Sequence, residues 1–183
     1  MIDALVTFGE LLRDRLIAAA PLPDLAIWGT SLGLLGLYGL IAIPFGLWRG
    51  LLRWEPIGEI GDIAATLLIA LVYPSLLEEI LFRVFWLPHP SESPSIATFL
   101  VWSVLALAVF IAAHPFNAWI FLPSRRDTFY NPTFLGLAGL LGGVCTLAYG
   151  LSGSLWPPVI LHWAIVVIWL LLLGGQGRLA QSA

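Results

Sequence analysis

The sequence predicts an all-α polytopic bundle of about five transmembrane helices, preceded by an amphipathic helix. Of its 183 residues, 60% are hydrophobic and only 10% are charged, and the mean hydropathy is +0.95. These values lie outside the range of soluble domains. Five apolar stretches approach the roughly 20 residues that a helix needs to cross a bilayer. Since no internal repeat is evident, we expect residues 1–183 to form a single membrane domain.

The first 20 residues predict an amphipathic helix that lies in the membrane interface. Ile2, Leu5, Leu12 and Leu16 recur at helical spacing, and charged side chains occupy other positions. The stretch lacks the basic start and short apolar run of a signal peptide. We therefore expect it to remain on the mature protein.

The five predicted spans lie within residues 25–174, which should form the transmembrane bundle. The third span, predicted at 95–113, presents a difficulty, because His114 at its end would not meet Glu78 of the second span. The two side chains can meet if the third helix starts nearer Leu100 and continues through Pro115 to Leu122, and we expect this continuation. The predicted spans cover residues 25–48, 63–87, 95–113, 133–151 and 155–173.

The arginines predict the orientation of the chain in the membrane. Lysine is absent, so every fixed positive side chain is an arginine. With five spans, Arg13 and Arg15 lie on one side of the membrane and most other arginines on the other, which should be cytoplasmic. We expect a multi-pass protein of a bacterial inner or thylakoid-type membrane, with a cytoplasmic carboxyl terminus. The arginines of the majority side are Arg49, Arg53, Arg125, Arg126 and Arg178.

Three ionisable residues interrupt the second span. Glu78, Glu79 and Arg83 lie within six residues of an apolar helix, and each costs roughly 2.5–3.5 kcal/mol at the bilayer centre unless it has a partner or water. Glu79 and Arg83 share one helix face at i, i+4, whereas Glu78 points about 100° away. Glu78 is therefore the candidate for chemistry. The alternative is a buried structural triad that holds the helices in register.

His114 and His162 are the only histidines in the predicted spans. Each alone is more often a structural residue, but together with Glu78 they bring three polar groups from three helices. A glutamate and two histidines can bind zinc, whereas a water activated by a carboxylate needs no metal. With a single cysteine, Cys145, and no HExxH sequence, we predict no metal and no other cofactor.

These residues resemble the CPBP family of intramembrane glutamic proteases, which includes the type II CAAX prenyl endopeptidases and the Abi-type bacteriocin-immunity proteins. Residues 78–83 (EEILFR) match its EExxxR motif, and residues 110–114 (FIAAH) match FxxxH. His162 matches the histidine of a third motif. The resemblance covers roughly residues 63–170.

The resemblance implies a role for each matched residue. Glu78 and His114 would activate a water for attack on a peptide carbonyl, and Glu79 and Arg83 would be the supporting pair. In the family the third motif continues to an Asn four residues after its His, and both are thought to hold the oxyanion. This sequence has Val166 at that position. Phe110 is the first residue of the second motif.

Val166 leaves more than one function open, because a valine side chain donates no hydrogen bond. The leading hypothesis is an intramembrane endopeptidase that acts on a hydrophobic or lipidated peptide or on a membrane protein. The alternative is a non-catalytic scaffold or assembly factor that binds other membrane proteins through glycine-rich helices. A proton-coupled transporter is a weaker hypothesis, given the few spans and the lack of repeats. Membrane lipids are expected partners, and nucleic acid is not, since the net charge is −3 and no basic patch occurs.

Overall fold

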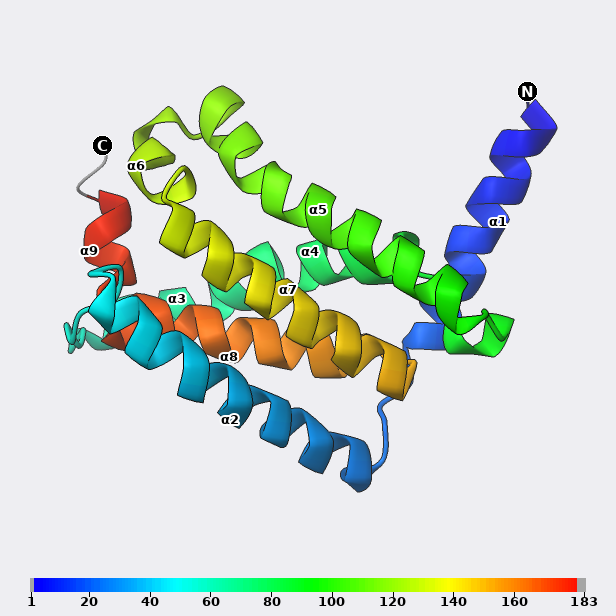
Figure 1. Ribbon diagram of the computed structural model, residues 1–183, viewed down its shortest axis with the longest axis horizontal. Helices are drawn as coiled ribbons and strands as arrows, with labels where there is room; N and C mark the ends of the chain where they lie inside the picture. The colour runs from blue at the N-terminus through cyan, green and yellow to red at the C-terminus, as the bar shows by residue number, and fades with distance from the viewer. Residues whose placement is uncertain (1, 181–183) are drawn as a thin grey trace.

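The predicted all-α bundle is confirmed by the computed structural model, which describes residues 2–180 and, from residue 6 onward, their side chains. Every regular element in this range is a helix, and the one β-bridge is an isolated pairing of Glu55 with Leu173 (Figure 1). The chain is a multi-pass membrane protein. Four of its described helical segments are long and apolar enough to span a membrane, and a fifth apolar helix has 17 residues. They are α2 (Leu25–Trp48), the segment that starts with α3 (Ile60–Ala70), α5 (Ile96–Ile120), α7 (Pro132–Ser152) and α8 (Trp156–Leu172).

Helix α1 (Ile2–Ala19) projects from one end of the bundle (Figure 1). It is fastened near its end, where Arg15 forms an ion pair of 2.6 Å with Glu92 and Ala19 is fully buried. Apolar side chains such as Phe8 are exposed. Its location in the membrane interface stays a prediction.

The second span is not the continuous helix that we predicted over residues 63–87. After α3, the backbone of Tyr73 leaves helical geometry, with φ −133° and ψ 118°. Tyr73 lies in η1 (Leu71–Leu76), which is followed by α4 (Leu77–Glu79) and η2 (Ile80–Phe85), and both η1 and η2 are π-helical. Pro74 supplies the physical reason, because it has no amide hydrogen to donate to the preceding turn. The break lies about one turn before Glu78.

The third span continues past Pro115, as we predicted, but it begins earlier than proposed. Helix α5 runs from Ile96 to Ile120 rather than starting near Leu100. Ser95 sets the start, because its hydroxyl accepts a hydrogen bond from the Thr98 amide at 3.0 Å. The helix therefore spans the bundle and places His114 one to two turns before its end.

Residues 88–94, a stretch rich in proline and serine, form a turn that is not exposed throughout. His89 is buried, and its Nε2 atom lies 2.8 Å from the carbonyl oxygen of Gly153. This contact joins the connection before α5 to the turn between α7 and α8. Its helical part is η3 (Pro90–Glu92).

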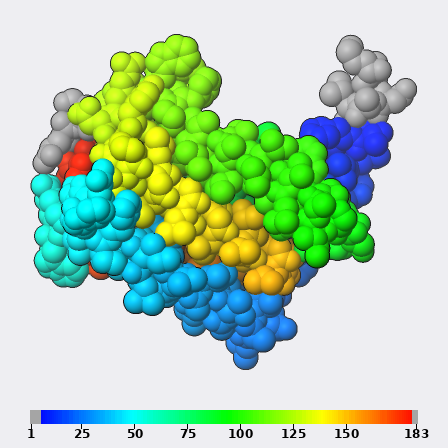
Figure 2. All heavy atoms as spheres, viewed as in Figure 1, coloured from blue at the N-terminus to red at the C-terminus, as the bar shows by residue number. Residues whose placement is uncertain are grey.

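Helix α7 lies at the centre of the face in Figure 2, between α5 on one side and α2 on the other. It packs on α2, α5 and α8, and a core cluster that includes Tyr38, Leu141 and Leu161 joins α2, α7 and α8. These contacts fix the position of α8, which carries His162.

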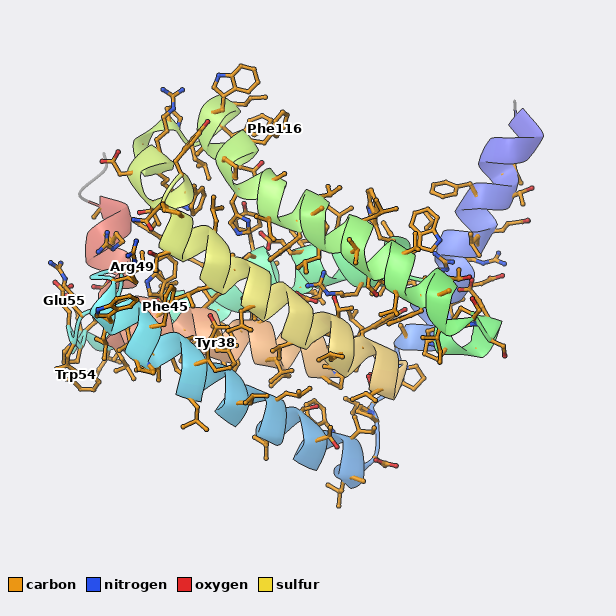
Figure 3. All side chains as sticks on the ribbon, in the orientation of Figure 1. Tyr38, Phe45, Arg49, Trp54, Glu55 and Phe116 are labelled. Carbon is orange, nitrogen blue, oxygen red and sulfur yellow. The ribbon has the colours of Figure 1, made fainter. Side chains whose placement is uncertain are left out.

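One end of the bundle carries five of the arginines, and we call it the arginine face. Here lie Arg49 after α2, Arg53 in the next loop, and Arg125, Arg126 and Arg178 in the short elements η4 (Pro123–Arg125), α6 (Arg126–Phe129) and α9 (Gly175–Ala180). Figure 3 shows Arg49, Trp54 and Glu55 gathered at this end of α2. The opposite face holds the end of α1 and the turn with His89.

Candidate active site

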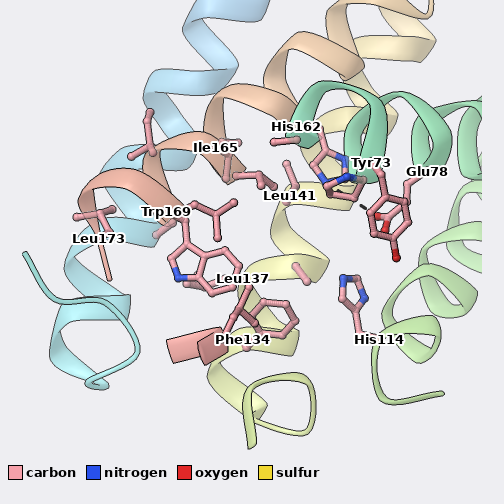
Figure 4. Close-up of a pocket in the computed structure, with 18 of the residues that line it drawn as sticks. Tyr73, Glu78, His114, Phe134, Leu137, Leu141, His162, Ile165, Trp169 and Leu173 are labelled. Atoms are coloured by element: carbon pink, nitrogen blue, oxygen red, sulfur yellow. Dashed lines mark ion pairs between the residues drawn. The ribbon is translucent and has the colours of Figure 1, made fainter. Parts of the chain in front are cut away.

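A cavity of about 840 Å³ extends from the middle of the bundle toward the arginine face. Its wall contains Glu78, Phe110, His114, His162 and Val166, contributed by α4, α5 and α8. Figure 4 shows Glu78 and both histidines around this space. Most of the lining is apolar, so the few polar groups in it act in a poorly solvated environment.

Glu79 and Arg83 form the predicted pair, and they lie behind the cavity wall. Glu79 Oε2 is 3.1 Å from Arg83 Nε, and neither side chain is exposed. Arg83 also donates a hydrogen bond of 3.1 Å to the Gly142 carbonyl of α7, and its guanidinium lies over the Phe110 ring. The pair thereby ties the second span to α5 and α7.

His162 contacts both acids of the EExxxR motif. Its Nδ1 atom is 2.8 Å from Glu79 Oε1. Its Nε2 atom is 4.0 Å from Glu78 Oε2, and Figure 4 shows these last two side chains next to each other. A carboxylate can only accept, so Nδ1 carries the proton and Nε2 is directed toward Glu78. Sequence reasoning missed the bond to Glu79, because no local spacing connects residues in different spans.

Glu78 differs from Glu79 in its surroundings. Its side chain is 19% exposed, whereas that of Glu79 is fully buried. Among the described residues, Glu78 Oε2 has no hydrogen-bond partner. A buried acceptor without a partner costs about 1–3 kcal/mol, more if it is charged, unless a ligand or water meets it. The Glu78 carboxylate is therefore the acid that is available to molecules in the cavity.

His114 lines the same cavity without contacting Glu78 directly. Its Nδ1 atom donates to the Phe110 carbonyl at 3.0 Å, so in the neutral ring Nε2 is a free acceptor. The imidazole packs edge-on against the rings of Phe110, Phe129 and Phe134, at centroid distances of 5.1 to 5.6 Å. The described contacts include no ion pair between His114 and Glu78, and cavity space lies between them (Figure 4).

Val166 lies one helical turn after His162 and also faces the cavity. It presents only methyl groups where the resembling family has an amide. Trp163, on the same helix, donates its indole N–H to the Leu67 carbonyl at 2.9 Å. That contact fastens α8 to α3 and leaves the Trp163 donor engaged outside the site.

The cavity wall also contains polar side chains that were not predicted as site residues, among them Tyr73, Asn117 and Arg125. Asn117 could have been found, since it follows His114 by three residues and so shares its helix face. Tyr73 faces the cavity beside the helix break (Figure 4), and no simple periodicity predicts that. Arg125 comes from the loop after α5, whose course the sequence left open.

No group of three or more His, Cys, Asp or Glu side chains among the described residues is arranged to hold a metal ion. The two histidines contact different partners, one a backbone carbonyl and the other two carboxylates.

Comparison with known proteins identifies the family. No curated protein and no solved structure matched the chain. A family model described as type II CAAX prenyl endopeptidase Rce1-like matches residues 60–168. The match covers more than half of the 183 residues and contains Glu78, His114, His162 and Val166. The chain therefore belongs to the Rce1-like family of type II CAAX prenyl endopeptidases.

Proposed function

We propose that the protein is an intramembrane endopeptidase that hydrolyses a peptide bond with water as the nucleophile and Glu78 as the general base. The observation that carries this proposal is the contrast between two neighbouring acids. Glu79 is fully buried, pairs with Arg83 and accepts a hydrogen bond from His162, whereas Glu78 lines the apolar cavity, is 19% exposed and contacts only His162, at 4.0 Å. A structural triad would engage both acids.

In the proposed reaction, a water in the cavity donates a hydrogen bond to Glu78 and another to Nε2 of His114. Glu78 takes a proton as the water oxygen attacks the carbonyl carbon, and the proton then passes to the nitrogen of the leaving amine. Nε2 of His162 faces the same space and is the group proposed to stabilise the developing oxyanion when it carries a proton. Glu79 keeps that ring in place through Nδ1.

The proposed substrates are hydrophobic or lipidated peptides and the tails of membrane proteins. The size and apolar lining of the cavity support them, since specific ligands of such cavities bury most of their surface against apolar walls. The family match supports a CAAX-type peptide among them. We also propose that the arginine face is cytoplasmic, on the basis of its excess of arginine.

The test is turnover of a library of fluorogenic hydrophobic peptides, prenylated and unprenylated, by protein in nanodiscs. Wild type should cleave at least one peptide, and Glu78→Gln should abolish cleavage without loss of folded protein. Glu59→Gln makes the same chemical change at an exposed position outside the cavity and should leave turnover unchanged. Cleavage that survives in Glu78→Gln would falsify the assignment of the general base.

A non-catalytic membrane scaffold is the second candidate function, and two observations favour it. Val166 provides no hydrogen-bond donor to the site. A side chain added at Gly29, Gly33 or Gly36 of α2 would meet no atom within 4 Å, so these three glycines face away from the bundle. Small residues allow close packing of a second helix in lipid. Cross-linking in native membranes tests this function, because Gly33→Ile should remove a specific partner while the fold is kept.

A further inference from the structure

The eight arginines of the chain all lie in its described part, and seven of them have partners there. Arg13, Arg15, Arg53 and Arg83 each pair with a carboxylate. Arg49, Arg126 and Arg178 donate to a threonine hydroxyl or to backbone carbonyls. The guanidinium of Arg125 forms no hydrogen bond and no ion pair with any described residue. It is thus the exception among the described arginines.

Arg125 is also the one arginine, within the described range, that lines the cavity containing Glu78 and His114. It is half-buried, at the end of the cavity near the arginine face. The Asp62 carboxylate lines this cavity as well, but it is not within ion-pair distance of Arg125. A guanidinium beside an apolar space carries five donors and loses part of its hydration there, so an anion that enters the cavity gains a strong partner.

Tyr73 and Asn117 connect Arg125 with the proposed catalytic groups. Tyr73 lies beside Glu78 in the cavity wall (Figure 4). Asn117 lies about one turn beyond His114 on α5. The wall of one cavity therefore carries Glu78, His114, Tyr73, Asn117 and Arg125.

We infer that Arg125 binds the free terminal carboxylate of a peptide whose scissile bond lies at Glu78. This inference rests on the proposed function and adds a specificity-determining residue to it. The two oxygens of a carboxylate match the fork of a guanidinium, and the Asn117 amide and the Tyr73 hydroxyl are further donors in the lining of the same cavity. The bound peptide then runs from the middle of the bundle toward the arginine face in its amino-to-carboxyl direction.

The experiment measures binding in the Glu78→Gln background, which separates recognition from turnover. A peptide that the wild type cleaves, or any hydrophobic library peptide if none is cleaved, is prepared as the free acid and as the carboxyl-terminal amide. Binding to protein in phosphatidylcholine nanodiscs is measured by fluorescence anisotropy. The acid should bind roughly tenfold to hundredfold more tightly than the amide, which is the range for a hydrogen bond to a charged group.

Arg125→Gln should remove this preference by weakening binding of the acid and leaving that of the amide unchanged. Arg126→Gln is the matched control, since Arg126 is the next residue and its guanidinium caps the Ala118 and Trp119 carbonyls outside the cavity. It should keep the preference. Thermal melting of each variant shows whether the protein is folded. If Arg125→Gln is not folded, Arg125→Lys replaces it in the binding experiment.

Equal affinity for acid and amide, or a preference that persists in Arg125→Gln, would overturn the inference. A third outcome would also overturn it. If phosphatidylglycerol added to the nanodisc abolishes the preference for the acid, and the protein retains this lipid only when Arg125 is present, the anion that Arg125 binds is a lipid phosphate. The proposed function fails separately. If the protein cleaves no peptide but binds the acid more tightly through Arg125, the proposed function fails and the inference about Arg125 stands. If it cleaves the acid and the amide equally, the proposed function stands and the inference about Arg125 fails.

Discussion

Nδ1 of His162 lies 2.8 Å from Oε1 of Glu79, so the histidine of α8 is held by the same carboxylate that pairs with Arg83. All three side chains are buried. One acid therefore fixes both the buried cation and the imidazole that faces Glu78. This arrangement separates the structural acid from the acid available for chemistry, and the two can be tested independently.

Glu79→Gln should lower the yield of folded protein in membranes, whereas Glu78→Gln should not. The first change leaves Arg83 as a buried cation without its counter-ion, and breaking such a pair costs about 3–5 kcal/mol. The second changes a group that has no cation partner. Fluorescence-detected size exclusion and thermal melting in detergent measure the difference. An equal loss of yield in both variants contradicts the division of roles.

His114 and His162 should respond differently to replacement by phenylalanine. His162→Phe leaves a buried oxygen of Glu79 without its donor, at a cost of about 1–3 kcal/mol or more. His114→Phe places an aromatic ring among the three phenylalanine rings that already surround this position, so stability should change by less than about 1 kcal/mol.

Turnover and melting temperature together test this contrast. Both variants should lose peptidase activity, but only His162→Phe should also melt at a clearly lower temperature. A His114→Phe protein that remains active would remove His114 from the proposed water site. A His162→Phe protein as stable as wild type would mean that Glu79 does not depend on the imidazole.

Val166→Asn should raise peptidase activity. An amide one turn after His162 would reach the space beside the imidazole, and a single oxyanion donor is worth about 10²–10³ in rate where it has been measured. The gain should disappear when Glu78→Gln is added, because an oxyanion donor cannot act without an activated water. Turnover of a fluorogenic hydrophobic peptide by wild type, single and double variants is the measurement.

The result for Val166→Asn also separates the two candidate functions. If the variant folds and neither it nor wild type cleaves any peptide of a broad library, the scaffold becomes the better interpretation. A gain that persists with Glu78→Gln would instead place the general base elsewhere.

Gly142→Ala should destabilise the protein, and Gly143→Ala should not. A side chain at Gly142 would approach Leu107 to 2.6 Å and Phe110 to 3.1 Å, where α7 packs on α5. Overpacking of this kind costs typically about 1–3 kcal/mol. At Gly143 no atom lies within 4 Å, so alanine should be neutral or stabilise the helix by up to about 1 kcal/mol. Melting temperatures in one detergent compare the variants, and equal values would show that the α5–α7 contact adapts.

Local patterns were sufficient to predict the helices and one part of the site. Hydropathy indicated the spans, and i, i+4 spacing indicated the pair of Glu79 with Arg83, because both depend on neighbouring residues. The bond between Glu79 and His162 joins positions 83 residues apart, and it follows from how α8 packs, which periodicity does not encode. The break at Tyr73 and the position of Arg125 depend likewise on loop and kink geometry.

The contact between His89 and Gly153 has a mechanical consequence for the cavity. Together with the bonds from Ser154 to the Pro21 carbonyl and from Trp156 to the Ala20 carbonyl, it ties the loops of the opposite face to one another. Toward the arginine face, no hydrogen bond or ion pair among the described residues joins α3 to α5. Among these residues α3 and α5 are thus not joined directly at this face, whereas Gln176 joins α9 to α3 and Arg49 joins the end of α2 to α7.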